Sequence, residues 1–302
     1  MKRWLKLVFG LLATMVMFAS QAQAPIKIRH SQGELVLPQA PKRVVALEFS
    51  FVDALVSVGV PPVGIADDKT PDRIIAPLRE AVKGYQSVGS RYQPSLEAIA
   101  SLKPDLILAD QRLHGVIWRE LTAIAPTLLV ESRTSYQEEL DAMLLIGQAV
   151  GRETRMAQRL AEHTRTMNRL AEEIRNGGKL NAALAISSDK GTWLHTETTY
   201  AATLLQRLGF PSPLKGQRSA AWAEPYAKVG LEQMLSVNPD VVLLGRYSTP
   251  SQVDTWSTSP LWQAVSAVKH QRVYPVDGNL WARARGLISA ELMATQLRDA
   301  LR

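Results

Sequence analysis

Runs of β-branched and aliphatic residues alternate along the chain with segments of helical periodicity. In the first half the pattern predicts strands at 43–47, 63–66, 105–109 and 127–130 and helices at 49–58, 96–102 and 116–124. The alternation begins again at residue 182, with strands at 182–187, 241–245 and 273–276 and helices at 200–208, 231–237 and 288–301. Such alternation is typical of parallel sheets covered by helices. The pattern therefore predicts two α/β lobes of similar size.

A long helical segment lies between the two lobes. Residues 153–176 contain neither proline nor glycine, and their apolar residues fall at spacings that suit one helix face: Met156, Leu160, Met167, Leu170 and Ile174. A continuous helix over this segment would be about 36 Å long. Its solvent-facing side is expected to carry Arg152, Arg155, Arg159, Arg165, Arg169 and Arg175. We predict a rigid connecting helix within 151–179, with lobes at 25–150 and 180–302; the alternative is an ordinary surface helix inside one domain.

An internal repeat supports the division into two lobes. The segment SLEAIASLKPDLIL at 95–108 matches GLEQMLSVNPDVVL at 230–243 at a constant offset of 135 residues. Each copy reads as a helix, a proline that cannot continue it, and a buried strand. Two copies in one chain indicate duplicated lobes and not a longer repeat array.

The first 22 residues have the pattern of a secretory signal peptide. A basic start is followed by a 13-residue apolar run at 7–19 and by small residues at 20–24. Thirteen residues are too few to span a bilayer, which needs about 20. We expect cleavage after Ala22, with Ala24 as the alternative site; a short buried helix is the competing interpretation.

Charge and composition change once this leader is removed. The 302 residues are 46% hydrophobic and 21% charged, as in soluble globular proteins. Without the leader the 35 basic residues fall to 32 against 28 acidic ones, so the net charge falls from +7 to +4 and gives little reason to expect nucleic acid as a partner. The chain has no cysteine, which excludes disulfides, thiolate metal sites and lipidation of a cysteine. These features predict a periplasmic protein without a lipid anchor.

Enzyme signatures are absent from the sequence. It contains no nucleophile elbow, dinucleotide-binding glycine turn, phosphate-binding loop or zinc-binding helix, and its five histidines are scattered without the spacing of metal ligands. For an enzyme acting on a small carboxylate, the candidate bases and nucleophiles would be Glu48, Ser50 and His195.

Arginines accompany aromatic residues where predicted strands end. Arg91 precedes the first repeat helix, Arg112 and Arg246 follow strands in the two lobes, and Arg283 and Arg285 follow the strand that ends at residue 276. Ligands of open parallel sheets bind beyond the carboxyl ends of the strands. Because guanidinium groups match carboxylates, we hypothesise a cleft for an anionic ligand, with solvated surface arginines as the alternative.

Three tryptophans and one histidine complete the candidate binding site. Trp193, Trp222 and Trp281 lie in or beside predicted loops, where they would line a ligand or else pack against the core. His195 ends a strand-like alternation that could face the cleft. The repeated glutamates Glu97 and Glu232 each lie in the first turn of a repeat helix, where a carboxylate either complements the helix dipole or docks a two-fold partner.

The run QSVGSRYQPSLEAIASLKPD at 86–105 resembles the first-lobe signature of the periplasmic binding proteins of iron-siderophore and vitamin B12 ABC importers. The resemblance extends over essentially the whole mature chain. Within the family it is strongest to members that bind iron(III) dicitrate, through ALEFSF at 46–51, GIADD at 64–68, LHTET at 194–198 and WARARG at 281–286. It implies the class III fold, two Rossmann-like lobes joined by a single long rigid helix.

The resemblance also implies roles for particular residues. Arg91 stands where family members carry an arginine that grips the siderophore, and Trp222 and Trp281 match positions where hydroxamate-binding relatives place aromatics. Glu97 and Glu232 match the carboxylates that pair with arginines of the permease dimer. The ligand-binding set is then Arg91, Arg112, Trp193, His195, Trp222, Arg246, Trp281, Arg283 and Arg285.

The implied function is capture of iron(III) dicitrate and its delivery to an inner-membrane ABC permease. Citrate oxygens would hold the iron, so the protein would need no metal ligands and no cofactor, and it is expected to act as a monomer. His195 could donate to a citrate carboxylate and make binding sensitive to pH. The alternatives are another ferric siderophore, of carboxylate or hydroxamate type, and a periplasmic α/β enzyme.

Overall fold

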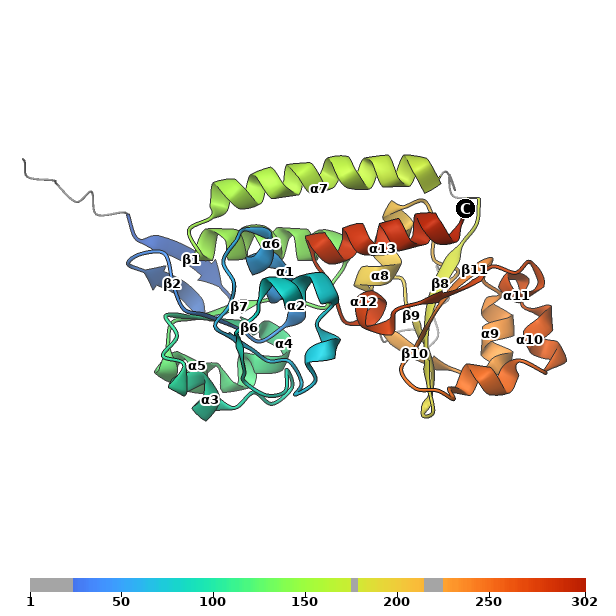
Figure 1. Ribbon diagram of the computed structural model, residues 1–302, viewed down its shortest axis with the longest axis horizontal. Helices are drawn as coiled ribbons and strands as arrows, with labels where there is room; N and C mark the ends of the chain where they lie inside the picture. Colours follow the sequence, from blue (N-terminus) through green and yellow to red (C-terminus); the bar gives the residue numbers. More distant parts are fainter. Residues whose placement is uncertain (1–23, 175–178, 215–224) are drawn as a thin grey trace, which may run out of the picture.

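The computed structural model describes residues 24–174, 179–214 and 225–302, which form two α/β lobes beneath one long helix (Figure 1). The sheet of the first lobe has the order β5-β4-β3-β6-β7, and all its paired strands are parallel. Its strands are β3 (Val44–Ala46), β4 (Gly64–Ile65), β5 (Gln86–Ser87), β6 (Leu106–Asp110) and β7 (Thr127–Val130). The predicted strands of this lobe are confirmed to within two residues, and β5 was not predicted.

The sheet of the second lobe is mixed. Its order is β10-β9-β8-β11-β12, and β9 runs antiparallel to both of its neighbours. The expectation of a wholly parallel sheet is wrong here because β8 and β9 form a hairpin closed by a two-residue turn before Gly191, whose φ of +148° suits glycine. The strands are β8 (Ala182–Ser188), β9 (Gly191–His195), β10 (Tyr226–Val229), β11 (Val241–Arg246) and β12 (Val273–Val276).

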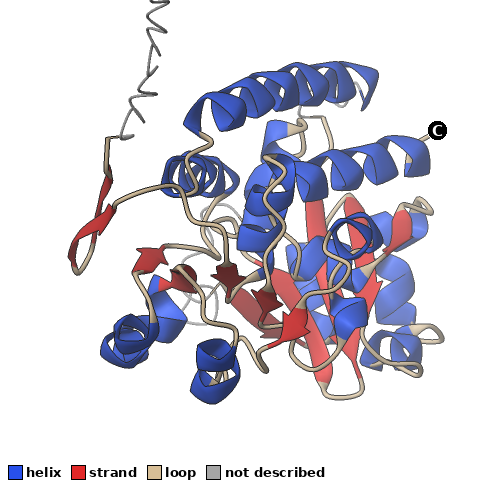
Figure 2. Cartoon of the chain, turned by 60° about the vertical axis from the view of Figure 1, so that its left-hand side comes forward, coloured by secondary structure: helices blue, strands red, loops and turns tan. Residues whose placement is uncertain are grey.

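Helices cover both sheets. In the first lobe they are α1 (Phe49–Ser57), α2 (Ala76–Ala81), α3 (Leu96–Ser101), α4 (Gln111–His114), α5 (Trp118–Ile124) and α6 (Tyr136–Ala149). In the second they are α8 (Tyr200–Arg207), α9 (Leu231–Val237), α10 (Pro260–Ala264), α11 (Ser266–Lys269), α12 (Gly278–Ala282) and α13 (Leu287–Ala300). A hairpin of β1 (Ile26–His30) and β2 (Gly33–Leu37) forms a separate two-stranded sheet at the side of the first lobe (Figure 2). Among these described helices, none is long and apolar enough to cross a membrane.

The connecting helix α7 (Glu153–Ile174) is continuous over 22 residues and packs on α6 and α13 (Figure 1). Its buried side chains are Met156, His163, Met167 and Leu170. Arg159, expected in solvent, instead donates from both terminal nitrogens to Glu291 of α13 at 2.8 Å. The predicted leader and the end of the predicted helix beyond Ile174 lie outside the described residues.

The two lobes share one apolar core beneath α7. A single cluster of buried side chains joins Phe51 of α1, Met143 of α6, Met156 of α7 and Met293 of α13. Each sheet also has a core of its own on its other face. The shared core ties the lobes together where α1, α6, α7 and α13 meet.

The aspartate of the internal repeat, Asp105 in one copy and Asp240 in the other, makes the same kind of contact in both lobes. Asp105 accepts hydrogen bonds from the backbone N–H groups of Lys42 and Arg43, just before β3, at 2.8 and 2.7 Å. Asp240 accepts one from the backbone of Asn181, just before β8, at 3.1 Å. In each lobe the carboxylate therefore anchors the start of the neighbouring strand, which explains why the repeat contains an aspartate after its proline.

Candidate functional site

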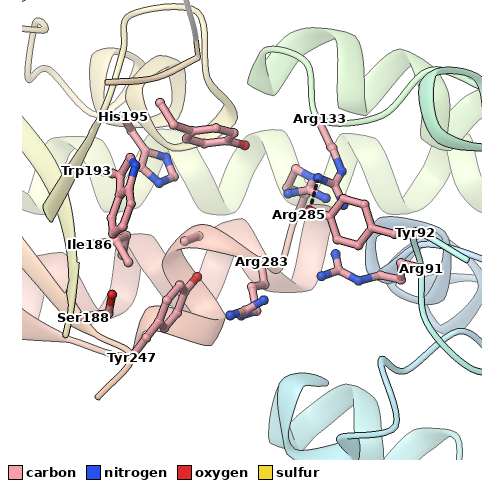
Figure 3. Close-up of a pocket in the computed structure, with 12 residues that line it drawn as sticks. Arg91, Tyr92, Arg133, Ile186, Ser188, Trp193, His195, Tyr247, Arg283 and Arg285 are labelled. Carbon is pink, nitrogen blue, oxygen red and sulfur yellow. Dashed lines mark hydrogen bonds between the residues drawn. The ribbon is translucent and has the colours of Figure 1, made fainter. Parts of the chain in front are cut away.

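A pocket of about 370 Å³ lies between the lobes, bounded by loops and strand ends of both (Figure 3). Its volume is within the range of small-ligand sites. The first lobe contributes Arg91, Tyr92 and Arg133. The second contributes Ile186, Ser188, Trp193, His195, Tyr226, Tyr247, Ala282, Arg283 and Arg285. Four arginines and four large aromatic residues therefore face the same space.

Three of these arginines converge on one buried carboxylate, that of Glu48. Its Oε2 accepts from Arg91 Nη1 at 3.2 Å and from Arg285 Nη2 at 3.1 Å. Its Oε1 accepts from Arg133 Nη2 at 2.8 Å and Nε at 3.3 Å. Glu48 is fully buried, which by itself would raise its pKa, but the three guanidinium charges outweigh burial and lower the pKa to about 2. The carboxylate is therefore ionised at every physiological pH.

Arg91 is fixed by several further contacts. Its Nε and Nη2 donate to Asp68 at 3.1 and 2.8 Å, and its guanidinium lies 4.1 Å from the centre of the Phe49 ring. The ring of His114 lies 2.7 Å from the Arg91 carbonyl oxygen. Only 3% of the residue is exposed. Arg91 therefore presents a rigid donor to the pocket.

Arg283 differs from the other three arginines. Among the described residues it makes no ion pair, and its buried Nε has no hydrogen-bond partner. Its guanidinium lies 4.2 Å from the centre of the Tyr247 ring. Burial lowers the pKa of Arg283 from its usual value, as expected for a cation without a carboxylate beside it. Its charge is therefore available to an anionic ligand.

The opposite wall of the pocket is aromatic (Figure 3). Trp193 and His195 lie on β9, and the His195 ring packs edge-on against Tyr226 at 4.8 Å between ring centres. Tyr226 and Tyr247 are 40% and 42% exposed, and Tyr92, which lies beside Arg133 on the first-lobe side, is 59% exposed. A ligand in the pocket would cover all three rings.

His195 does not carry the pH sensitivity expected from its residue type. Only 6% of the residue is exposed, and its Nδ1 is buried without a hydrogen-bond partner. Burial, reinforced by the charge of Arg285, lowers its pKa to about 3. The neutral ring remains able to donate one hydrogen bond to a ligand.

We therefore predict that the His195 ring signals of the ligand-free protein do not titrate between pH 5 and 8 in an NMR experiment. Unfolded histidine titrates near 6.5, so the unfolded chain binds the extra proton first. The contribution of neutral His195 to stability is present above that pH and is lost as the pH falls from about 6.5 toward 3. A ring titration with its midpoint between pH 5.5 and 7 would contradict this assignment.

Several residues expected in the site lie elsewhere. Arg112 is exposed on α4, and Arg246 is exposed and pairs with Asp254 at 3.1 Å, so neither lines the pocket. Trp281 is 1% exposed, and its indole donates to Gln296 of α13, so it packs in the core and does not line this pocket. Trp222 lies outside the described residues. By contrast Arg91, Trp193, His195, Arg283 and Arg285 are brought together.

Arg133 is the main pocket residue that was not predicted. It lies three residues beyond the end of β7, so the rule that ligands bind beyond the carboxyl ends of strands would have identified it. Its backbone N–H donates to Glu139 at 2.8 Å, and its Nη1 donates to the Tyr92 hydroxyl at 3.1 Å. Tyr226 was also missed, because its strand β10 was not predicted, and Ser188 was not selected although it directly follows the predicted strand at 182–187.

The helices that carry the repeated glutamates, α3 and α9, lie in opposite lobes, away from α7 (Figure 1). Glu97 is exposed in the first turn of α3, and Glu232 is exposed in the first turn of α9. Neither pairs with a basic side chain in the described part of the chain. Both carboxylates are therefore free to contact a partner.

Known proteins resemble this chain over most of its length. The sequence model of the periplasmic binding protein family matches residues 44–280. The Fe(3+) dicitrate-binding periplasmic protein FecB of Escherichia coli (strain K12) is 40% identical over 268 residues, 88% of this chain and 87% of that protein. The Fe(3+)-citrate-binding protein YfmC of Bacillus subtilis (strain 168) is 37% identical over 276 residues, 91% and 84% of the two chains.

A solved structure shares the fold. Staphylococcus aureus SirA, complexed with staphyloferrin B, superposes with a TM-score of 0.80 at 24% identity and covers 91% of this chain and 98% of SirA. These relatives are substrate-binding proteins and not enzymes, which confirms both the resemblance seen at residues 86–105 and the predicted two-lobed architecture. The chain is a substrate-binding protein of ABC import, and it belongs to the periplasmic binding protein family.

Proposed function

We propose that this chain captures iron(III) dicitrate in the pocket between its lobes and delivers it to an inner-membrane ABC permease. The observation that carries the proposal is the cluster of Arg91, Arg133, Arg283 and Arg285 at one pocket of about 370 Å³. Two relatives above 30% identity that are named for ferric citrate support the choice of ligand. On this proposal the chain works in the periplasm as a monomer, after removal of residues 1–22 and without a lipid anchor.

The chemistry of the pocket suits an anionic chelate. In a ferric citrate complex the oxygens of citrate coordinate the iron, and the negative charge lies on the carboxylates at the outside. A guanidinium group can donate two parallel hydrogen bonds to one such carboxylate. The part of the chain that the structure describes contains no cluster of three His, Asp or Glu side chains placed to hold a metal ion. The proposal therefore assigns the iron to citrate and the recognition of citrate to arginines.

Calorimetric titration of the purified protein with ferric citrate, iron-free citrate and a neutral ferric hydroxamate tests the ligand. We expect ferric citrate to bind at least about tenfold more tightly than citrate alone, because the compact complex presents several carboxylates at once to fixed donors. A neutral hydroxamate should bind weakly, since it cannot pair with four guanidinium groups. Tighter binding of the hydroxamate would refute ferric citrate as the ligand.

Glu97 and Glu232 are the proposed contacts to the permease. Replacing both with alanine should leave calorimetric affinity for ferric citrate unchanged, because neither residue lines the pocket, and should abolish uptake of radioactive iron citrate in cells that carry the permease. Glu34→Ala, which removes an exposed carboxylate of β2, is the matched control and should transport normally. Wild-type uptake by the double variant would disprove the docking role.

A further inference from the structure

Glu48 is a helix-start residue whose side chain does not cap its own helix. It lies between β3 and α1 and occupies the N-cap position of α1, where a polar side chain usually accepts from the first turn. Here no such bond is made. The neighbouring residues Leu47 and Phe49 are buried, so the chain places an ionised carboxylate inside an apolar surround. Such burial is costly and needs an explanation.

The partners of Glu48 come from three separate loops of both lobes. Arg91 follows β5 and Arg133 follows β7 in the first lobe, while Arg285 lies between α12 and α13 of the second. All three donate to the two oxygens of this one carboxylate at 2.8 to 3.3 Å. Without it, three cations would lie close together in a half-enclosed space and repel one another.

The other nearby carboxylates cannot replace Glu48. Asp68 is shared between Arg91 and Arg73, outside the centre of the cluster. Glu139 lies 3.4 Å from Arg285 Nε but is fully buried, and burial raises its pKa to about 7, so it is partly protonated at neutral pH. Glu48 is thus the ionised carboxylate that Arg91, Arg133 and Arg285 share.

We propose that Glu48 is a positioning residue that holds Arg91, Arg133 and Arg285 in one array and sets the net positive charge that the pocket presents to its anionic ligand. The identity of the ligand in this proposal rests on the proposed function, whereas the arrangement of the three arginines around Glu48 does not depend on it. Glu48 itself does not line the pocket, so it would act on a ligand through the arginines.

The test compares Glu48→Gln with the wild-type protein in calorimetric titrations of ferric citrate at several salt concentrations. The amide keeps the size of the side chain but loses its charge, so the arginines are no longer drawn to one point. We expect Kd to rise about tenfold at physiological salt, because the loss of fixed donor positions outweighs the attraction of the one added positive charge. Because the pocket gains one net positive charge, binding should also weaken more steeply with added salt than in the wild type.

The matched control is Glu291→Gln. Glu291 is also a carboxylate paired with arginine and histidine, but it lies between α7 and α13 and away from the pocket. The Glu291→Gln substitution should lower the stability of the protein without changing the Kd for ferric citrate or the salt dependence of binding. Unchanged or tighter binding by Glu48→Gln would overturn the proposal. Weaker binding with the salt dependence of the wild type would also overturn it, because a purely structural defect lowers affinity equally at every salt concentration.

A measurement without ligand separates this proposal from the identity of the ligand. The Nε–H of Arg133 donates to Glu48, so its NMR signal should exchange slowly with water in the wild type and rapidly in Glu48→Ala, which has no acceptor at this position, whereas Glu48→Gln keeps one carbonyl oxygen. If the wild-type protein does not bind ferric citrate but shows this difference, the proposed function fails and the positioning role stands. Equal exchange rates in the two proteins would refute the positioning role.

Discussion

Replacing Arg283 with alanine is expected to weaken the binding of ferric citrate by about 10- to 100-fold, the effect of one or two hydrogen bonds to a charged group. Arg283 is the arginine at the pocket for which the described residues provide no carboxylate. Its removal therefore leaves no buried acid without a partner. We expect the free energy of unfolding to change by less than about 1 kcal/mol.

Alanine substitution of any of the other three pocket arginines would test ligand binding less clearly. Truncating Arg91, Arg133 or Arg285 removes a partner of the buried Glu48, so lost affinity would be mixed with lost stability. Arg283→Ala avoids this difficulty, and so is the sharper test of recognition by arginine.

The matched control for Arg283 is Arg246→Ala. The sequence placed both arginines in the cleft, but the structure pairs Arg246 with Asp254 on the surface. Calorimetry should find the Kd of Arg246→Ala within twofold of the wild-type value. If the two variants bind equally well, or lose the same affinity, the pocket is not the ligand site.

The architecture followed from the sequence because its signals are local. A buried parallel strand is a short apolar run, and a proline separates it from the helix before it. Accordingly β7, which follows Pro126, and α9, which Pro239 follows, match their predicted ranges. The connecting helix was likewise visible as a long segment without proline or glycine. The β8–β9 hairpin escaped notice because its turn residues, Asp189 and Lys190, are not a characteristic hairpin pair.

The site was less predictable because it depends on contacts between distant residues. Proximity to a predicted strand end selected Arg283 and Arg285, which line the pocket, but the same rule also selected Arg246, whose side chain pairs on the surface. Arg91, which also lines the pocket, was selected by its place before the first repeat helix. Glu48 was singled out only as a possible catalytic base. Its bonds span 43, 85 and 237 residues of sequence, and spacing along the chain carries no signal for contacts of that range.

The structure also contains a set of hydrogen bonds between the lobes that the sequence did not predict. Asp53 of α1 is fully buried and accepts from the backbone N–H groups of Ile288 and Ser289 at 3.1 and 2.9 Å and from the Ser289 hydroxyl at 2.7 Å. It thereby caps α13, whose own N-cap residue is Gly286 and provides no side chain. Gly286 has a φ of +129°, and a Cβ there would lie 2.4 Å from Asp53 Cγ, so the close approach requires glycine.

Asp53→Ala should consequently destabilise the protein by about 2–5 kcal/mol, because three donors at a buried helix start lose their acceptor. Denaturant unfolding at neutral pH measures the loss. Ser95→Ala, which removes the N-cap of α3 within one lobe, should cost only about 0.5–2 kcal/mol. Hydrogen exchange should further show that the first turn of α13 opens in Asp53→Ala, because the bond that holds it to the first lobe is gone. A loss no larger than that of Ser95→Ala, with α13 still protected, would contradict a role for Asp53 in joining the lobes.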